Sequence, residues 1–410
     1  MKSTASLLGL SVLLGACATP APTPPQAPVI STQPPAASAP AAESKPPAAV
    51  AVLPQTPPPV VITPPGTPAP RPPAANPRQL LGKLMPAAAR QRDSWRDDIL
   101  GAFGALQLQP SAENLCAVIA VIEQESSFQA DPAVPGLPRI VWGKIGEKAG
   151  GYYVPLGLVK TALLKKSRDG RSYKERIDSL RTEGEMNDLF EEMAVEARNI
   201  GLPVGMKNPI RTGGPMQVSV EFAEAHVRAW PYPYPRRGSV RSEVFSQRGG
   251  VYFGSAILLQ YPVNYSSMLY RFADFNAGRY SSRNAAFQQA LASLSGSRLA
   301  PDGDLLRYDN GTTAGISSSQ KAVAKLRGKL QMSDADILRD LKLEKNAGFA
   351  DSPLYRKVMQ LADAQAGKRV AREVLPQIRL QSPKITRKLT TAWFAERVNG
   401  RYQQCLGRAG

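Results

Sequence analysis

The distribution of proline limits how much of this chain can fold. Of the 38 prolines among 410 residues, 21 lie between Cys17 and Arg78, in a stretch that is otherwise mostly Ala, Thr, Gln and Val and has no aromatic residue. Such a composition cannot bury enough apolar surface to offset the entropy lost on ordering. We therefore expect a disordered tether over residues 17–78 and a folded part of about 330 residues from residue 79 onward.

The first sixteen residues have the pattern of a signal peptide. Lys2 precedes an apolar run, Leu7 to Leu14, that is too short to span a bilayer as a helix. The run ends in Leu14-Gly15-Ala16-Cys17, which resembles the lipobox of bacterial lipoproteins. This resemblance implies that the chain is cut before Cys17 and that Cys17 receives a lipid anchor. An ordinary secretory peptide followed by a chance cysteine is the alternative.

The residue after the cysteine and the tether both bear on localisation. Lipoproteins that are kept at the inner membrane carry an aspartate directly after the lipidated cysteine, and this chain carries Ala18 there. By that resemblance we expect an outer-membrane, lipid-anchored protein that faces the periplasm. No later segment reaches the roughly 18 apolar residues of a membrane-spanning helix, which leaves the lipid as the expected anchor. In polyproline II conformation the tether would reach on the order of 150 Å.

The net charge of +18 belongs almost entirely to the folded part, because only Lys2, Glu43, Lys45, Arg71 and Arg78 are charged before residue 79. A field of this sign favours an anionic polymer as the partner. For a cytosolic chain, nucleic acid would be the first candidate. Behind a lipobox, the polyanions are instead the acidic stem peptides of peptidoglycan, lipid headgroups and lipopolysaccharide, so we expect no nucleic-acid partner.

Histidine and cysteine are scarce, which excludes several kinds of site. The single histidine, His226, rules out HExxH metalloproteases and histidine-rich metal centres. Cys116 and Cys405 either form a disulfide, as an oxidising compartment permits, or remain two separate buried thiols. A cysteine hydrolase that uses Cys116 and His226 is disfavoured, because Cys116 lies in an apolar run that gives a thiolate no stabilisation.

Helical periodicity runs through the folded part. Leu115, Val118, Ile119 and Ile122 recur at the spacing of one helix face, and clusters such as Gly213-Gly214-Pro215 separate such segments. The pattern predicts an α-dominated fold, in which residues 152–159 are the one modest strand-like run. Further helices are expected over residues 185–199, 222–230, 251–261, 285–294, 318–330 and 354–373.

The segment AVIEQESSFQADP, residues 120–132, contains the candidate catalytic group. On a helical wheel Glu125 lies on the flank of the apolar stripe, three residues after Ile122 and seven after Val118. A carboxyl group there is partly desolvated, which disfavours its charged form and suits a general acid. Glu123 projects about 160° away and is the weaker candidate. Taken alone, such a glutamate is more often a surface charge.

This segment and a second one resemble motifs of the lysozyme-like lytic transglycosylases. In that family a serine follows the catalytic glutamate, and an aromatic residue comes two positions later; Glu125, Ser126 and Phe128 match these positions. The second family motif is Gly-Leu-Met-Gln, which Gly214-Pro215-Met216-Gln217 resembles.

A third segment completes the resemblance. Asp274-Phe275-Asn276-Ala277-Gly278 is similar to the alanine-tyrosine-asparagine-alanine-glycine motif of the family. Between the second and third motifs, Gly254 resembles the glycine of a helix that separates them in the family. Each motif alone is weak, but their order along the chain makes chance agreement improbable.

The resemblance implies a lysozyme-like fold and a role for each matched residue. Glu125 would be the single catalytic acid and base, and Ser126 would hydrogen-bond near the substrate. Gly214, Met216 and Gln217 would line the cleft. Its far wall would consist of Phe275, Asn276, Ala277 and Gly278.

The chain also departs from the family. Glu125 and Gly214 are much further apart than usual, which predicts an insertion over about residues 133–211, and a helical C-terminal extension is expected over about residues 300–410. The insertion would be a lid, an extension of the substrate site or a surface for envelope proteins. Pro215 replaces a leucine, and Phe275 replaces a tyrosine and lacks its hydroxyl. As a whole, the chain also resembles a group of bacterial lipoproteins of unassigned function.

Together these features predict an outer-membrane lipoprotein that cleaves the bond between N-acetylmuramic acid and N-acetylglucosamine in peptidoglycan. The resemblance implies a single-glutamate reaction that yields 1,6-anhydro products and needs no metal or cofactor. The expected partners are the glycan strands and, through the N-terminal lipid, the membrane. The main alternative is a non-catalytic peptidoglycan-binding lipoprotein that tethers envelope to wall, with its cleft blocked by the insertion. A muramidase that uses water is a closer alternative.

Overall fold

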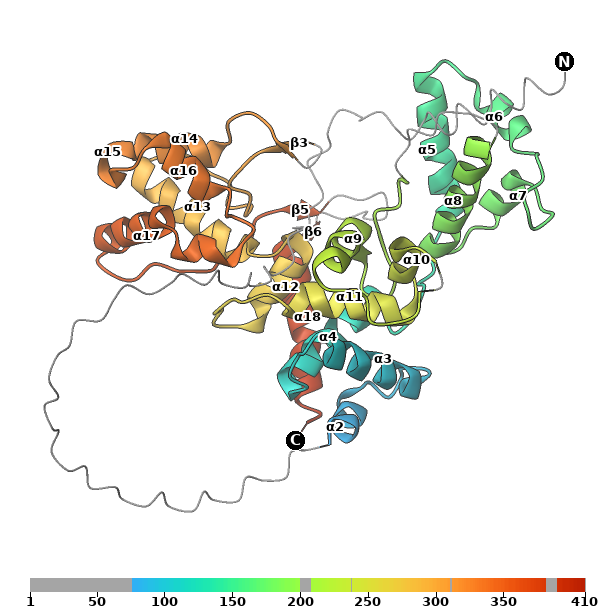
Figure 1. Cartoon of the computed structure of the whole chain (residues 1–410), viewed down its shortest axis with the longest axis horizontal. Coiled ribbons are helices and arrows are strands. Elements are labelled where there is room, and N and C mark those ends of the chain that lie inside the picture. Colours follow the sequence, from blue (N-terminus) through green and yellow to red (C-terminus); the bar gives the residue numbers. More distant parts are fainter. Residues whose placement is uncertain (1–75, 200–207, 237, 310–311, 381–388, 410) are drawn as a thin grey trace, which may run out of the picture.

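The computed structural model describes residues 76–199, 208–236, 238–309, 312–380 and 389–409, and helices dominate it (Figure 1). The prediction of an α-dominated fold is therefore confirmed. Within these ranges the strands form three two-stranded antiparallel hairpins. The helices fall into three groups, each around an apolar cluster of its own, which we call the central, insertion and C-terminal cores.

The central core combines helices from both ends of the described chain with helices from its middle. Residues 115–122 of α4 are all buried, as expected of a helix that is apolar on every side and lies inside a core. Trp95, Phe222, Phe253 and Phe272 are the large side chains around it. The helices are α2 (Pro77–Leu84), α3 (Arg92–Ala105), α4 (Ala112–Glu125), α9 (Val220–Ala229), α10 (Val240–Val244), α11 (Gln247–Leu259), α12 (Met268–Ala277) and α18 (Thr391–Leu406).

The insertion expected between the first two motifs folds around its own core at one end of the molecule (Figure 1). Tyr173, Ile177, Leu189 and Met193 are buried there. Its helices are α5 (Leu137–Gly151), α6 (Leu156–Ala162), α7 (Tyr173–Asp178) and α8 (Glu183–Asn199).

The strand-like run predicted at residues 152–159 is wrong. Helix α5 continues to Gly151, and the chain then turns through Tyr153, whose φ of 57° is left-handed. Pro155 caps the next helix, α6, which begins at Leu156. Residues 152–159 therefore form a turn and the start of the next helix, and not a strand.

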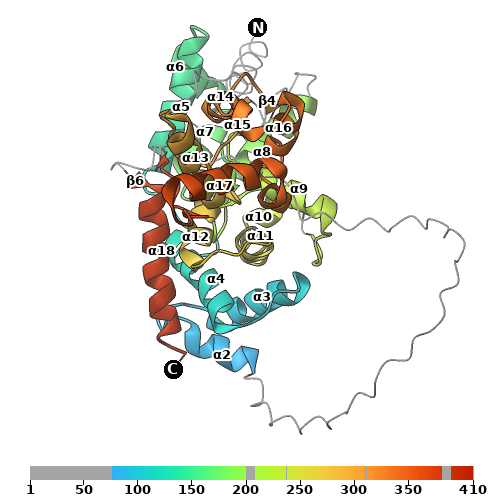
Figure 2. The ribbon, with the colours of Figure 1, turned by 90° about the vertical axis from the view of Figure 1, so that its left-hand side faces the viewer.

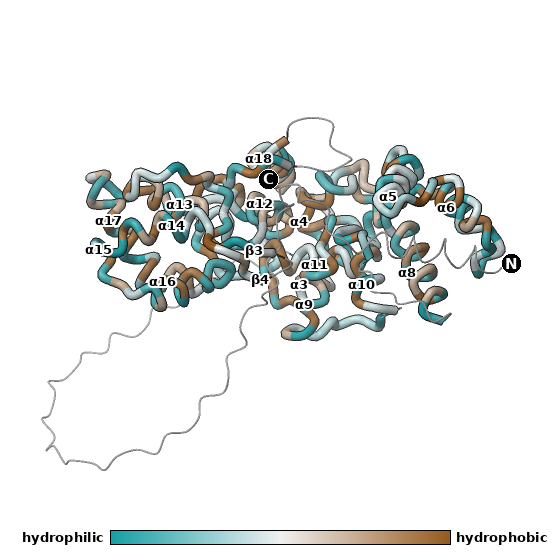
Figure 3. The backbone as a smooth tube through the Cα atoms, turned by 90° about the horizontal axis from the view of Figure 1, so that it is seen from above, coloured by the Kyte–Doolittle hydropathy of each residue, from teal (hydrophilic) through white to brown (hydrophobic). Residues whose placement is uncertain are grey.

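The C-terminal core lies at the opposite end of the molecule, and Figure 3 shows hydrophobic and hydrophilic residues interspersed along its amphipathic helices. The helix expected over residues 318–330 is divided in two at Leu326, and the one expected over residues 354–373 ends early, at Ala366, because Gly367 adopts a left-handed φ of 64°. The elements are α13 (Ser281–Ser295), α14 (Ser318–Lys325), α15 (Arg327–Leu330), α16 (Asp334–Leu341), η1 (Ala347–Asp351) and α17 (Pro353–Ala366).

Three short hairpins lie between or within these groups. β1 (Thr212–Gly213) pairs with β2 (Val218–Ser219) just before α9. β3 (Tyr308–Asp309) pairs with β4 (Thr312–Thr313) in the C-terminal group. β5 (Arg379–Leu380) pairs with β6 (Leu389–Thr390) and delivers the chain into α18.

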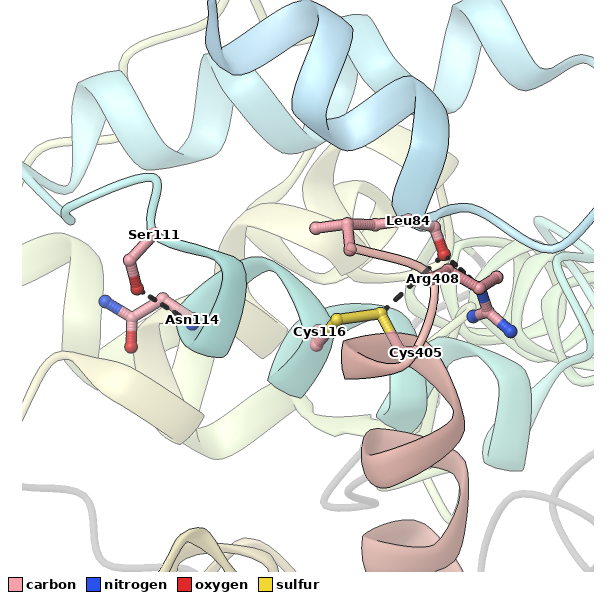
Figure 4. The surroundings of a disulfide bond; sticks show 6 residues. All are labelled: Leu84, Ser111, Asn114, Cys116, Cys405 and Arg408. Carbon is pink, nitrogen blue, oxygen red and sulfur yellow. Dashed lines mark hydrogen bonds between the residues drawn. A yellow bond between two sulfur atoms is a disulfide. The ribbon is translucent and has the colours of Figure 1, made fainter. Parts of the chain in front are cut away.

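Helix α18 leaves the expected C-terminal extension and returns to the central core. It runs along one side of the molecule and ends close to α2 (Figure 2), packed against α4 and α12. Its Cys405 forms a disulfide with Cys116 of α4 (Figure 4), so the pairing that the sequence left open is present. The guanidinium of Arg408 donates to the carbonyl of Leu84 at 2.7 Å and ties the same end to α2.

Candidate functional site

Glu125 is the last residue of α4. Ser111 caps the start of this helix by accepting a hydrogen bond from the Asn114 amide, and the apolar run that follows buries the helix. The Glu125 side chain is half-buried, as expected for a position on the flank of the apolar stripe. It also lies at the negative end of the helix dipole, which disfavours the ionised form of a carboxyl group.

Ser126 ends the helix instead of facing a solvent-accessible cleft. It is buried, and its hydroxyl donates to the carbonyl of Ile122 at 2.9 Å. Its backbone amide donates to the same carbonyl at 3.0 Å. While this internal bond is intact, the buried Ser126 hydroxyl could only accept, and not donate, a hydrogen bond in the expected contact with substrate.

The turn after Glu125 is held in an unusual backbone conformation. Ser127 and Phe128 have left-handed φ values of 49° and 61°, a region that residues with a side chain rarely adopt. The Phe128 ring is buried edge-on against Trp95, with ring centroids 5.3 Å apart. Burial of this aromatic residue offsets the strain and fixes the direction in which the chain leaves Glu125.

The second motif forms the turn of the β1–β2 hairpin. Gly214 has a φ of 71°, and a Cβ atom there would lie 2.1 Å from the carbonyl oxygen of Val244, so the position accepts glycine alone. Gln217 is also left-handed, with a φ of 50°, and its side chain is half-buried. The turn therefore presents Gln217 in a fixed backbone conformation.

This turn packs directly on α11. Met216 is fully buried, and a Cβ atom at Gly254 would lie 2.3 Å from its Sδ. A Cβ atom at Gly250, one helical turn earlier, would lie 2.4 Å from Cδ of Pro215. Because Gly250 and Gly254 lack side chains, the second motif can pack directly against this face of α11. Met216 supports the turn from beneath and does not itself line an open surface.

The third motif ends α12. Asn276 is half-buried, and its side-chain oxygen accepts a hydrogen bond from the Thr391 hydroxyl at 3.0 Å. Phe275 and Ala277 are buried, and Gly278 follows with a φ of 108°. Among the residues expected to form the far wall of the cleft, Asn276 is the one with a partly exposed side chain.

A residue that sequence reasoning passed over organises this third segment. The Asp274 carboxylate is fully buried and accepts hydrogen bonds from the hydroxyls of Tyr261 and Tyr265, at 3.1 and 2.7 Å. It also accepts from the backbone amides of Tyr280 and Ser282. Burial raises the pKa of Asp274, and these donors oppose that shift. The signal available in the sequence was the single acidic residue of α12, which stands between Ala273 and Phe275.

Helix α18 also closes over α4 on the side of Glu123. The guanidinium of Arg401 lies 4.0 Å from the Glu123 carboxylate, so this weaker candidate faces the closing helix. Residues 381–388, immediately before β6 and α18, lie outside the described residues, as do residues 1–75, which include Cys17 and the expected signal peptide and most of the expected tether.

Cys116 and His226 do not form a nucleophile pair. Cys116 is part of the disulfide, and His226 is buried between Phe222 and Tyr252. Burial lowers the pKa of His226 to about 4, so the ring is neutral at physiological pH. These observations agree with the exclusion of a cysteine hydrolase.

The insertion contacts the second motif through Glu183. The Gln217 side-chain amide donates to the Glu183 carboxylate at 3.1 Å, although the two residues come from different cores. Burial and, to a lesser extent, the nearby Glu185 and Glu183 raise the pKa of Asp131, which lies in the loop after Glu125. The sequence patterns did not identify Glu183.

In the described part of the chain, no group of three or more histidine, cysteine or acidic side chains is arranged to hold a metal ion. No helix within the same ranges is long and apolar enough to cross a membrane. A polar cavity of about 510 Å³ lies in the insertion, and none of its lining residues belongs to the three motifs. They are Arg171, Arg176, Ser179, Leu180, Arg181, Glu185, Asp188 and Leu189.

Comparison with known proteins identifies a family without an assigned activity. Residues 88–408 match the family described as protein of unknown function (DUF1615). The chain is 49% identical over 327 residues to the uncharacterized protein YaiW of Escherichia coli (strain K12), an alignment that covers 80% of this chain and 88% of that protein. No solved structure matches the chain significantly. The family match includes all three motifs and both cysteines of the disulfide.

Proposed function

This chain belongs to the DUF1615 family of unknown function, and we propose that it is a lipid-anchored lytic transglycosylase of peptidoglycan whose central core is lysozyme-like. The proposal follows from the resemblance of the three motifs and from where their residues lie in the fold. The half-buried Glu125, Gln217 and Asn276 are the members with partly exposed side chains. They supply one carboxyl group and two amides, which suits a sugar substrate that needs protonation at one atom and hydrogen bonds at others.

The observation that carries the proposal is the contact between the second motif and α11. In the family, this motif and the glycine-containing helix are separate features of the sequence. Here Met216 packs on Gly254, and Pro215 packs on Gly250. Chance agreement of short motifs would not by itself predict glycines at the two positions where the turn touches the helix.

The proposed reaction needs one carboxyl group. Protonated Glu125 donates its proton to the glycosidic oxygen between N-acetylmuramic acid and N-acetylglucosamine, and the bond to the anomeric carbon breaks. The acetamido group of the substrate stabilises the positive charge that develops on the sugar ring. The proposal requires Glu125 to be protonated when this step begins.

The second step regenerates the acid. The Glu125 carboxylate accepts the proton of the 6-hydroxyl group of the muramoyl residue, and that oxygen bonds to the anomeric carbon. The product is a 1,6-anhydro ring, and Glu125 is protonated again. Most glycoside hydrolases use two carboxyl groups, so the single-glutamate route depends on the substrate for its nucleophile.

We also propose that Cys17 carries lipid and holds the enzyme at the outer membrane, facing the periplasm. The lipobox-like sequence and the proline-rich residues after it support this location. When cells are labelled with radioactive palmitate, the wild-type protein should carry the label and the Cys17→Ser variant should carry none. Equal label in the two proteins would contradict lipid anchoring at Cys17.

Product mass tests the proposed reaction. Purified sacculi are digested with the mature chain, and the released muropeptides are analysed by mass spectrometry. We expect 1,6-anhydro-muropeptides, which are one water lighter than the products of a hydrolase. Hydrolysed products alone would identify a muramidase.

One observation favours the non-catalytic alternative. The Gln217 amide, which the cleft would offer to substrate, already donates to Glu183 of the insertion. A blocked cleft with a basic surface would retain the chain on the wall without cutting it. Binding to sacculi in a pull-down, with no product released over a long incubation, would support this function.

A further inference from the structure

The contact between Glu183 and Gln217 is prepared by the start of α8. The Thr182 hydroxyl accepts from the Glu185 amide at 3.1 Å, and the Glu185 carboxylate accepts from the Thr182 amide at 3.4 Å. This reciprocal pair is a capping box, which fixes where the helix begins. Glu185 is thereby engaged in capping, while Glu183 occupies the first helical position and projects toward the second motif.

The same helix start is fastened to the loop that follows Glu125. The Gly184 amide donates to the Asp131 carboxylate at 3.3 Å, and a Cβ atom at residue 184 would lie 2.5 Å from that carboxylate. Ala133 forms a bridge with Thr182, so the chain enters the insertion beside the point where α8 begins. The position of Glu183 is thus tied to the segment that carries Glu125.

A second set of contacts fastens α8 to the supports of the second motif. The Arg241 guanidinium of α10 donates to the carbonyl of Ile210, just before β1, at 2.8 Å and to the buried side chain of Asn187 on α8 at 3.3 Å. Asn208 donates to the same Asn187 oxygen at 3.0 Å. Because α8 is held at two places, the contact of Glu183 with Gln217 does not depend on a single flexible side chain.

The chemistry of the pair determines how Gln217 is oriented. An ionised carboxylate can only accept hydrogen bonds, so Glu183 binds the NH₂ group of the Gln217 amide and not its oxygen. The left-handed backbone of Gln217 restricts the remaining freedom of the side chain. The amide oxygen is then directed away from Glu183, as an acceptor.

We propose that Glu183 is a positioning residue of the cleft, and that it holds the Gln217 amide with its oxygen available to a hydroxyl or acetamido N–H group of the glycan. The inference rests on the proposed function. It makes the insertion part of the active site. Neither the polar cavity of the insertion nor its exposed surface is needed for this role.

Two substitutions of Glu183 separate positioning from charge. Glu183→Ala removes the acceptor, whereas Glu183→Gln keeps an oxygen that can accept from Gln217 but removes the charge. We expect Glu183→Ala to lower kcat/KM on sacculi by about tenfold or more, the scale of one charge-assisted hydrogen bond, and Glu183→Gln, whose amide can either accept from or donate to Gln217, to restore part of it. Glu147→Gln, a substitution of an exposed residue on α5 of the insertion, is the matched control and should match wild type.

A double substitution tests whether the effect passes through Gln217. If it does, Glu183→Ala should cost little further activity in a Gln217→Ala background, because the group that it orients is gone. Additive losses would contradict the inference. An unchanged kcat/KM in Glu183→Ala would do the same.

Two measurements do not require turnover. The side-chain amide resonances of Gln217, identified by their loss in Gln217→Ala, should shift in Glu183→Ala and stay unchanged in Glu147→Gln. A tetramer of N-acetylglucosamine should bind Glu125→Gln protein more weakly when Glu183 is also replaced by alanine. Inactive wild-type protein would remove the proposed function alone, whereas unshifted Gln217 resonances or unchanged tetramer binding would overturn the role of Glu183.

Discussion

At the scale of single residues, only some of the motif residues have side chains that a substrate could reach. Glu125, Gln217 and Asn276 have half-buried side chains, whereas Ser126 and Met216 are buried and maintain the backbone around them. A motif resemblance cannot distinguish these roles, because both kinds of residue recur in the same short segment. The distinction depends on neighbours distant in sequence, such as Gly254 beneath Met216.

Gly254→Ala should destabilise the central core. The added Cβ atom would lie 2.3 Å from Sδ and 2.7 Å from Cβ of Met216, so the turn or the helix must shift, at a cost of about 1–3 kcal/mol. Gly143→Ala in α5 is the matched control, because a Cβ atom there has no neighbour within 4 Å. That variant should be neutral, or more stable by about 0.5–1 kcal/mol. Denaturant unfolding with equal effects in both variants would contradict the packing described for the second motif.

Glu344 should make the C-terminal core sensitive to pH. Its buried carboxylate accepts from the amides of Leu305 and Leu306 and from the Tyr308 hydroxyl. Burial raises the pKa of Glu344 from 4.5 to about 7. The folded chain therefore holds this proton more tightly than the unfolded chain, and the resulting stability is complete below about pH 4.5 and lost as the pH rises to 7.

Comparison with Glu344→Gln isolates this effect. Wild type should lose about 2 kcal/mol relative to the glutamine variant between pH 5.5 and pH 8, since the neutral amide does not titrate. His226, with a pKa lowered to about 4, adds stability as the pH rises toward 6.5, but it does so equally in both proteins. A difference between their unfolding free energies that stays constant over this range would contradict the assignment.

At the scale of elements, helices with an uninterrupted apolar face were predictable and their ends were less so. The run around Val118 identified α4, and the charged pattern identified most of α8. Residues 152–159 were wrongly predicted to be strand-like. The sequence pattern did not reveal the left-handed turn at Tyr153 or the helix that begins after Pro155. The contact of Glu183 with Gln217 was not predictable, because it depends on how the insertion core sits against the central core; the Thr182–Glu185 capping box was its one visible sign.

The disulfide should contribute strongly to the attachment of α18. Cys116 and Cys405 are 289 positions apart, so the bond closes a very large loop in the unfolded chain. Cys405→Ser should lower the unfolding free energy by about 2–5 kcal/mol. Reducing agent should weaken wild type to a similar degree and leave the variant unchanged. A wild-type protein insensitive to reduction would show that packing of α18 on α4 and α12 suffices without the bond.

At the scale of the whole molecule, each of the three cores has a different role in the proposed enzyme. The central core holds the three motifs, the insertion core delivers Glu183 to Gln217, and α18 returns from the C-terminal core to cover α4. The sequence analysis expected an insertion over about residues 133–211 but assigned it no specific residue. Through Gly184 and Glu183, the start of α8 contacts both Asp131, in the loop after Glu125, and Gln217 of the second motif.

The central claim is that Glu125 is the single catalytic acid and base. Digestion of sacculi by wild type, Glu125→Gln and Glu123→Gln, followed by mass spectrometry, tests it most directly. Glu123 lies on the same helix and faces Arg401, so its replacement controls for loss of a charge on α4. We expect 1,6-anhydro-muropeptides from wild type and from Glu123→Gln, and none from a folded Glu125→Gln. Equal release by Glu125→Gln, or no release by wild type, would contradict the proposed function.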